Sequence, residues 1–215
     1  MSTRIIVAGT DTDIGKTVFA AALTRALGGA YWKPVQAGLS GETDREVVQC
    51  LGALSDADVL PEIYRLSMPA SPHSAAAHDD ITIDPARLTP PASAKPLVIE
   101  LAGGLAVPLT PSLLQIDLLS TWAAPVVLCA ATRLGTINHT LLSIEALKRR
   151  AIPILGVAFI GDAAPEAEHA IGSFGRVRRL GRLPHLAPLT AETLHAAFAA
   201  NFRVADILGL GEGGP

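Results

Sequence analysis

The chain has 215 residues, and a hydrophobic share of 49% is enough to form one domain, over residues 1–215, with a substantial core. A formal net charge of −3 argues against broad binding to nucleic acid or to an anionic membrane. The apolar runs fall short of the roughly 20 residues that cross a bilayer, and the N-terminus does not resemble a signal peptide, so we expect a cytoplasmic protein. The two cysteines, Cys50 and Cys129, are expected to be small buried hydrophobes in a reducing compartment.

Apolar runs and helical patterns alternate along the chain. Short runs rich in Val and Ile predict strands at 4–8, 31–35, 97–101, 125–130, 154–160 and 179–183. Stretches with helical spacing predict helices at 16–28, 43–53, 112–123, 138–150, 165–174 and 190–200. Strands that are apolar on both faces and alternate with helices are typical of a parallel sheet. The sequence therefore predicts an α/β fold, a doubly wound, mostly parallel sheet with helices on both faces.

Three stretches lie outside this alternation. Residues 55–96 are rich in Pro, Ser and Ala, which predicts an irregular excursion over the surface, over a ligand if one binds there, and not a second domain. The basic run RVRRLGR, residues 176–182, is expected to be a solvated surface or strand edge, because the aromatic interleaving of nucleic-acid sites is missing. The last residues, 209–215, are expected to be frayed.

The stretch GTDTDIGKT, residues 9–17, links the first predicted strand to the first predicted helix and matches GxxxxGK[ST]. In such loops, successive backbone N–H groups and the positive end of the helix dipole hold phosphate. Lys16 is expected to reach the β- and γ-phosphates, and the Thr17 hydroxyl to bind Mg²⁺. Asp11 is expected to fix the loop by bonding its own backbone. The pattern predicts a P-loop NTPase-like fold that binds a nucleoside triphosphate.

The loop leaves the class of NTPase open. A signalling GTPase would carry an NKxD motif, and none is present. Partitioning ATPases of the ParA/MinD type carry a further lysine early in the loop, where this chain has Thr10 and Asp11. A nucleoside kinase would need an arginine-bearing lid, and residues 55–96 contain only Arg65 and Arg87. None of these classes is favoured by the loop.

Five further motifs follow the loop in a fixed order: KPVQAG at 33–38, SPH at 71–73, ELAGG at 100–104, RLGTINHT at 133–140 and LGRLPHL at 180–186. Together they resemble dethiobiotin synthetase, the ATP-dependent cyclo-ligase of biotin synthesis, over nearly the whole chain. The resemblance implies a reaction in which CO₂, or bicarbonate, joins one amine of 7,8-diaminopelargonate (7,8-diaminononanoate). ATP then phosphorylates the carbamate to a carbamic-phosphoric mixed anhydride, and the second amine displaces phosphate to close the ring of dethiobiotin.

The resemblance also implies roles for individual residues. Lys33 would stabilise the carbamate and the mixed anhydride, Lys16 the transferring phosphoryl group, and Thr12 would contact the diamine. The implied Mg²⁺ ligands are Thr17, Asp44 and Glu100. The residues expected around the nucleotide and metal are Gly9, Asp13, Ile14, Gly15, Lys16, Thr17, Val18, Asp44, Glu100, Leu101, Ala102, Gly103, Gly161, Asp162, Pro184, His185 and Leu186. The residues expected around the substrate are Thr12, Lys33, Ala37, Gly103, Gly135, Thr136, Ile137 and Asn138. The last four resemble the segment that receives the substrate carboxylate from a neighbouring subunit, so a homodimer with active sites at its interface is expected.

Simpler structural roles are open for several of these residues. Lys33, taken alone, would be a surface lysine before a proline turn. Asp44 and Asn138 could each be a helix N-cap, and Glu100 could be a carboxylate at a strand end. A carboxylate inside the apolar run LVIEL is costly unless it is paired or binds metal, which favours a functional role for Glu100.

Three positions depart from the family pattern. Ala37 stands where members usually carry Ser or Thr, so a hydroxyl contact to the diamine is lost. Leu101 replaces a glycine, and a left-handed backbone there would be strained. Gly161 replaces an Asn whose amide reads adenine, so we expect a weak preference for ATP over CTP or GTP. The alternatives are a ParA/MinD-like nucleotide switch, in which Lys33 would have no role, and a relative that has lost activity or changed its substrate.

Overall fold

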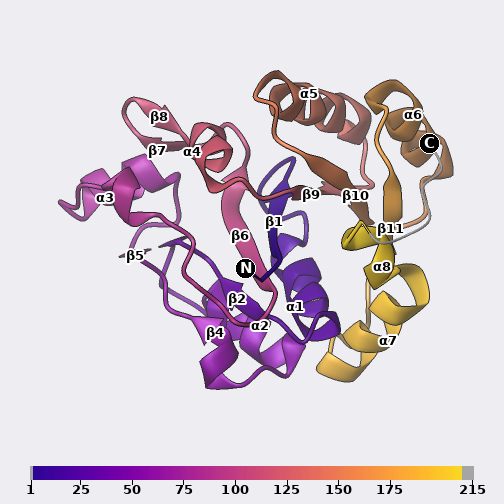
Figure 1. The fold of residues 1–215 in the computed structure, drawn as a ribbon, viewed down its shortest axis with the longest axis horizontal. Helices are drawn as coiled ribbons and strands as arrows, with labels where there is room; N and C mark the ends of the chain where they lie inside the picture. The colour runs from indigo at the N-terminus through magenta and orange to yellow at the C-terminus, as the bar shows by residue number, and fades with distance from the viewer. Residues whose placement is uncertain (1, 210–215) are drawn as a thin grey trace.

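A computed structural model describes residues 2–209, which form a seven-stranded sheet in the order β11-β10-β9-β1-β6-β2-β4 (Figure 1). Every pair of neighbouring strands in this sheet is parallel. The strands are β1 (Arg4–Gly9), β2 (Ala30–Trp32), β4 (Val59–Leu60), β6 (Leu97–Gly104), β9 (Val126–Ala131), β10 (Ile154–Ile160) and β11 (Arg179–Leu183). The chain runs outward from β1 in both directions, which confirms the predicted doubly wound sheet.

Helices cover both faces of the sheet. One layer contains α1 (Lys16–Ala26), α2 (Asp44–Gly52), α7 (Ala191–Asn201) and α8 (Val204–Ile207). The other contains α3 (Pro72–His78), α4 (Gln115–Trp122), α5 (Thr136–Arg149) and α6 (Pro165–Gly175). Successive residues of β1 serve the two layers: Ile5 packs in the core that contains Phe19 of α1, and Ile6 in the core that contains Trp122 of α4. This two-sided burial is why the strands read as continuous apolar runs.

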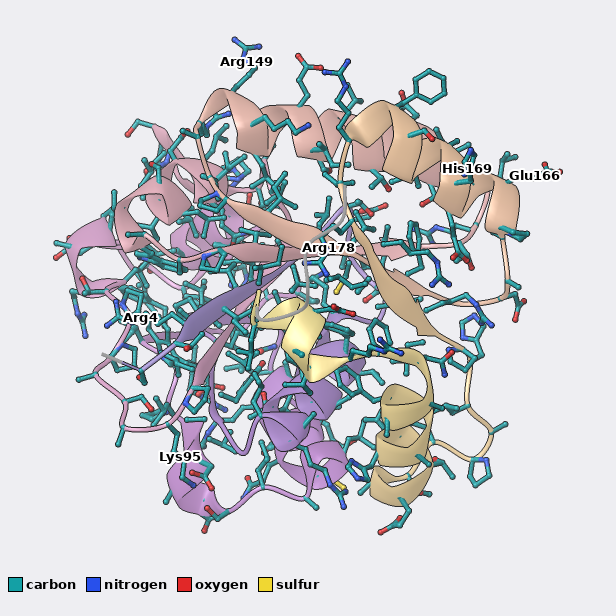
Figure 2. The ribbon with its side chains drawn as sticks, turned by 45° about the vertical axis from the view of Figure 1, so that its right-hand side comes forward. Arg4, Lys95, Arg149, Glu166, His169 and Arg178 are labelled. Carbon is teal, nitrogen blue, oxygen red and sulfur yellow. The ribbon has the colours of Figure 1, made fainter. Side chains whose placement is uncertain are left out.

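Charged side chains lie on the outer surface of the helices. Figure 2 shows Arg149 at the end of α5 and Glu166 and His169 on α6 pointing away from the sheet. Arg178, in the basic run 176–182, is exposed beside β11 at the sheet edge and lies 3.0 Å from Asp206. The prediction that this run forms a solvated strand edge is confirmed. Within residues 2–209, no helix combines the length and apolar character of a membrane span.

The prediction of one strand over residues 31–35 is wrong, because the structure has two separate strands there. β2 ends at Trp32, and β3 (Val35–Ala37) pairs with β5 (Tyr64–Leu66) in a separate two-stranded sheet. Pro34 lies between them and has no N–H to donate, so it cannot continue the ladder of the main sheet. The break lets Lys33 leave the strand and enter the site described below.

The segment 55–96 is more ordered than predicted. It supplies β4 at the edge of the main sheet, β5 and helix α3. Trp122 donates a hydrogen bond of 2.8 Å to the carbonyl of Leu88, which ties the end of the segment to α4. Strands of two or three residues, such as β4 and β5, are too short to be recognised from periodicity, which is why the prediction missed them.

Three smaller expectations also change. The predicted helix 112–123 begins only at Gln115, because a hairpin of β7 (Pro108–Thr110) and β8 (Leu113–Leu114) precedes it. The helix predicted at 138–150 begins at Thr136. Cys129 is buried as expected, but Cys50 is exposed, because it lies on the outer side of α2. The prediction for residues 209–215 falls almost entirely outside the described residues.

Candidate functional site

The loop between β1 and α1 has the backbone of an anion-binding site. Gly15, the residue before α1, has a left-handed backbone with φ of 87°, and no side chain caps the helix. The first N–H groups of α1 are therefore free to bind a ligand. A Cβ atom at Gly9 would lie 2.6 Å from Cδ of Lys16, so the loop can close over the lysine only with glycine at this position.

Lys16 folds back under the loop. Its Nζ donates a hydrogen bond of 2.8 Å to the carbonyl of Asp11, and the side chain is buried. Burial lowers the pKa of Lys16, and the attraction of Glu100 offsets part of this effect. Oδ1 of Asp11 accepts a bond of 2.8 Å from the N–H of Thr12, which confirms that Asp11 stabilises the loop.

Three oxygen-bearing side chains from three different elements meet beside Lys16. The Thr17 hydroxyl of α1 lies 2.6 Å from Oδ1 of Asp44 in α2 and 2.7 Å from Oε1 of Glu100 in β6. Tyr31, which sequence reasoning missed, donates a bond of 2.9 Å to the other oxygen of Glu100. Thr17, Asp44 and Glu100 all offer hard oxygen atoms, the ligand type that Mg²⁺ prefers, so these three residues fit that ion.

The structure excludes the simpler structural roles considered for Asp44 and Glu100. Thr43, not Asp44, is the N-cap of α2, and it forms a capping box with Glu46, so Asp44 is left free to face the loop. Glu100 lies inside β6 and is fully buried, and it is not at a strand end. Among residues 2–209, His, Cys, Asp and Glu side chains form no cluster of three that suits a metal. A site with two carboxylates and a hydroxyl suits Mg²⁺, which keeps several water ligands.

Lys33 completes the charge arrangement. Trp32 pairs with Ile99 in the sheet register, so the residues that follow, Lys33 and Glu100, are neighbours across β2 and β6. Nζ of Lys33 lies 2.5 Å from Oδ2 of Asp44 and 3.6 Å from Oε1 of Glu100. Only 7% of the Lys33 side chain is exposed, so it is not a surface lysine.

The titration of this cluster follows from burial and pairing. Burial alone would lower the pKa of Lys33, but the attraction of Glu100 and Asp44 outweighs it, so the pKa is raised. Burial raises the pKa of Glu100, and Lys33 offsets only part of the rise. Burial opposes ionisation of Asp44 as well, yet Lys33 holds its pKa below the usual value. The site therefore keeps a buried ammonium group next to the loop.

A cavity of about 610 Å³ opens over Lys16 and Lys33. Most predicted residues around the loop and the substrate line it: Thr12, Asp13, Ile14, Gly15, Lys16, Thr17, Lys33, Ala37, Asp44, Glu100, Ala102 and Gly103. The remaining wall, which was not predicted residue by residue, is Pro69, Ala70, Ser71, Pro72 and Val107. The SPH motif at 71–73 was the available signal for this wall. Residues 69–72 belong to the 55–96 segment, so that segment does border the cavity.

Gln115 shapes the end of β6 and was also missed. Its Nε2 donates to the carbonyls of Ala102, at 2.9 Å, and Gly104, at 3.1 Å, and its Oε1 accepts from the N–H of Ala102 at 3.2 Å. Between them, Gly103 has the left-handed φ of 62°. The strain expected at Leu101 is therefore absent, because the left-handed residue is Gly103, two residues later. The Leu101 side chain is buried in the core and lines neither large cavity, so its predicted role at the nucleotide is limited to its backbone.

A second cavity of about 520 Å³ lies on the other side of the loop, at the carboxyl ends of β9, β10 and β11. It shares Asp13, Ile14 and Gly15 with the first cavity. Its other predicted residues are Val18, Asp162, Pro184, His185 and Leu186, and those that were missed are Ala131, Thr132, Arg133, Ile160, Leu183 and Leu189. Gly161 lies directly beneath, next to Thr132 and His185. Ligands of open parallel sheets bind at this edge of the sheet.

The start of α5 is not brought into either large cavity. Gly135 is the N-cap residue with φ of 93°, so Asn138 is not the cap, and no side chain caps the helix. Gly135, Ile137 and Asn138 are exposed, while Thr136 is buried and lines a small hollow. The four residues thus present an open helix N-terminus to the outside of the described chain.

Comparisons with known proteins identify close relatives. A family model described as an AAA domain matches residues 3–193. A protein of Rhodopseudomonas palustris (strain BisA53) named ATP-dependent dethiobiotin synthetase BioD is 61% identical over 96% of this chain and 97% of its own length. A protein of the same name from Agrobacterium fabrum is 61% identical over 97% of this chain and 98% of its own.

Solved structures with similar folds are more distant in sequence. The cell division ATPase MinD of Pyrococcus furiosus has a TM-score of 0.55 and 17% identity, over 97% of this chain and 99% of its own. A ParA family ATPase from Chlorobium tepidum has a TM-score of 0.53 and 11% identity, over 98% of this chain and 92% of its own. At these identities the likeness supports the P-loop fold and gives no information about the reaction.

Proposed function

The chain belongs to the dethiobiotin synthetase family of P-loop enzymes. We propose that its two cavities bind different reactants, the diamine in the first and the nucleoside of the nucleotide in the second. The protein is an ATP-dependent ligase of biotin biosynthesis. The observation that carries the proposal is that the two cavities meet only at the loop residues Asp13, Ile14 and Gly15. A nucleotide whose phosphates lie on the loop would extend its nucleoside into the second cavity and its γ-phosphate towards the first.

The first cavity suits the diamine and the chemistry. Its polar side carries Lys16 and Lys33, and its opposite side, with Pro69, Pro72 and Val107, is apolar enough for an alkyl chain. Thr17, Asp44 and Glu100 would hold Mg²⁺, which when bound supplies positive charge to the phosphate oxygens. The buried ammonium of Lys33 would hold the carbamate anion close to the γ-phosphate, where two anions must meet.

The bonds formed and broken follow from this placement. One amine of 7,8-diaminopelargonate adds to CO₂ and loses a proton to give a carbamate. A carbamate oxygen attacks the γ-phosphorus and ADP leaves, with Lys16 facing the charge that develops on the phosphoryl group. The second amine attacks the carbonyl carbon of the mixed anhydride, phosphate leaves, and loss of a proton from the attacking nitrogen gives the cyclic urea of dethiobiotin. Thr12, beside Gly103 on the cavity wall, would orient the diamine.

We further propose a homodimer in which the start of α5 completes the neighbouring site. The N–H of Thr136 donates to the carbonyl of Arg133 at 3.1 Å, so the N–H groups of Ile137 and Asn138 are the ones that suit a carboxylate. A diamine substrate in the first cavity would present a carboxylate at its far end. Leu134 and Ile137 on the same turn are exposed apolar side chains, which favours burial against a second copy. The cytoplasmic location and the single-domain organisation stay predictions.

The test is direct. The purified protein is incubated with the diamine, labelled bicarbonate, Mg²⁺ and a nucleotide, and labelled carbon is followed into dethiobiotin. Product formed with at least one nucleotide supports the proposal, and no product with any of the four common nucleotides rejects it. Nucleotide affinity, measured separately by calorimetry, distinguishes a protein that binds without reacting from one that does not bind.

A further inference from the structure

The wall of the second cavity at the end of β10 has a main chain whose polar groups are already paired. The carbonyl of Ile160 accepts a hydrogen bond of 3.1 Å from the N–H of Thr132. The N–H of Gly161 donates to the carbonyl of Leu183 at 2.9 Å, and its carbonyl accepts from Nη1 of Arg182 at 2.8 Å. These bonds hold the turn in place, so the side chains beside it are polar groups that this part of the wall offers to a ligand.

Two polar side chains face the same point above Gly161. A Cβ atom added there would lie 2.4 Å from Oγ1 of Thr132 and 3.4 Å from Nε2 of His185. Gly161 also has φ of 126°, a conformation that other residues rarely adopt. The Thr132 hydroxyl therefore occupies the place where a side chain at position 161 would begin, and glycine is what makes room for it.

We propose that Thr132 is a base-binding residue: its hydroxyl, held against Gly161 and beside His185, hydrogen-bonds the polar edge of the nucleotide base. This inference rests on the proposed placement of the nucleoside in the second cavity. A hydroxyl is both a donor and an acceptor, so it can accept from the exocyclic amino group of adenine or cytosine, or donate to a ring carbonyl of guanine or uracil. Asp162, an exposed carboxylate on the same wall, can only accept when ionised.

The contact is tested with ATP and purine riboside 5′-triphosphate, which lacks the exocyclic amino group. Dissociation constants are measured by calorimetry, with Mg²⁺, for the unchanged protein and for Thr132→Val and Thr132→Ser. Loss of one neutral hydrogen bond corresponds to about three- to tenfold in affinity, so the unchanged protein should bind ATP more tightly than the analogue by that factor. Thr132→Val should abolish the difference, and Thr132→Ser, which keeps the hydroxyl, should retain it. A difference that persists in Thr132→Val overturns the proposal, as does its absence in the unchanged protein.

A second variant separates this inference from the placement on which it rests. Leu186→Trp fills part of the second cavity while the loop is unchanged. It should weaken ATP binding at least about tenfold, since a base no longer fits, and leave inorganic tripolyphosphate binding within about twofold of the unchanged protein. If Leu186→Trp behaves in this way and Thr132→Val keeps the preference for ATP, only the role of Thr132 is wrong. If Leu186→Trp binds ATP normally, the placement is wrong and the inference fails with it.

Discussion

Replacing Lys33 with glutamine tests the buried charge cluster most severely. Lys33 is the cation closest to Asp44 and faces the fully buried Glu100 at 3.6 Å. Removing one partner of a buried ion pair costs about 3 to 5 kcal/mol, because the other charge is left without compensation. A loss of about 3 kcal/mol would lower Tm by roughly 6 to 12 °C in a protein of this size. Loss of a group that stabilises a developing anion should also lower kcat by at least about a hundredfold.

The matched control is Lys95→Gln. Lys95, at the periphery of the molecule in Figure 2, is paired with Asp58 at 2.6 Å, but its side chain is 52% exposed. Exposed ion pairs contribute about 1 kcal/mol at most, so this variant should keep its activity and lose little stability. The two variants remove the same charge and differ in the burial of the lysine.

The loss of stability caused by Lys33→Gln should depend on pH. Burial already raises the pKa of Glu100 above its unfolded value, and removal of Lys33 raises it further. A carboxyl whose pKa is higher in the folded state binds more protons there, so stability falls as pH rises from the unfolded pKa to the folded pKa. The Tm difference between the unchanged protein and Lys33→Gln should therefore be larger at pH 8 than at pH 5.5.

Thermal unfolding by circular dichroism, the radiolabel assay and ATP calorimetry measure the three outcomes. Nucleotide binding should be largely retained, because Lys33 faces the first cavity and not the second. Turnover of Lys33→Gln at a rate comparable to that of Lys95→Gln would contradict the catalytic role of Lys33. Equal Tm values of the two variants at pH 8 would contradict its role in stabilising the buried carboxylates.

Three further predictions test the nucleotide cavity and the assembly. Gly161→Ala should lower Tm by several degrees, because φ is 126° and its Cβ would lie 2.4 Å from Oγ1 of Thr132, whereas Gly41→Ala, with open space around it, should leave Tm unchanged; equal effects would contradict this. Initial rates at equal concentrations of ATP, CTP, GTP and UTP should show CTP or GTP within a hundredfold of ATP, and a stronger preference for ATP would sink the idea of relaxed base selectivity. If the proposed homodimer forms, Leu134→Asp should be a monomer in sedimentation experiments and have lower activity than the unchanged protein; a fully active monomer would exclude a shared active site.

The features that could be predicted from the sequence depend on short stretches of chain. Alternating apolar runs and helical patterns predicted the doubly wound parallel sheet, since burial on both faces requires that alternation. The spacing of Gly9, Gly15, Lys16 and Thr17 predicted the loop, because its geometry is made by consecutive residues. Six ordered motifs were sufficient to indicate the family, and relatives about 61% identical over nearly their full length bear this out.

Other features depend on which strands become neighbours, and only the tertiary structure decided them. Lys33 meets Glu100 because β2 lies beside β6 in the register that pairs Trp32 with Ile99, and Tyr31 reaches the same carboxylate for that reason. The exposure of Cys50 and the borders of the two cavities were likewise set by packing between distant segments. By itself, then, the sequence determined the fold class, the phosphate loop and the family, because each of these depends on residues that are close together in the chain. The charge cluster and the partition into two cavities were decided by contacts between residues far apart in the chain, because side-chain pairing follows from strand order and not from spacing.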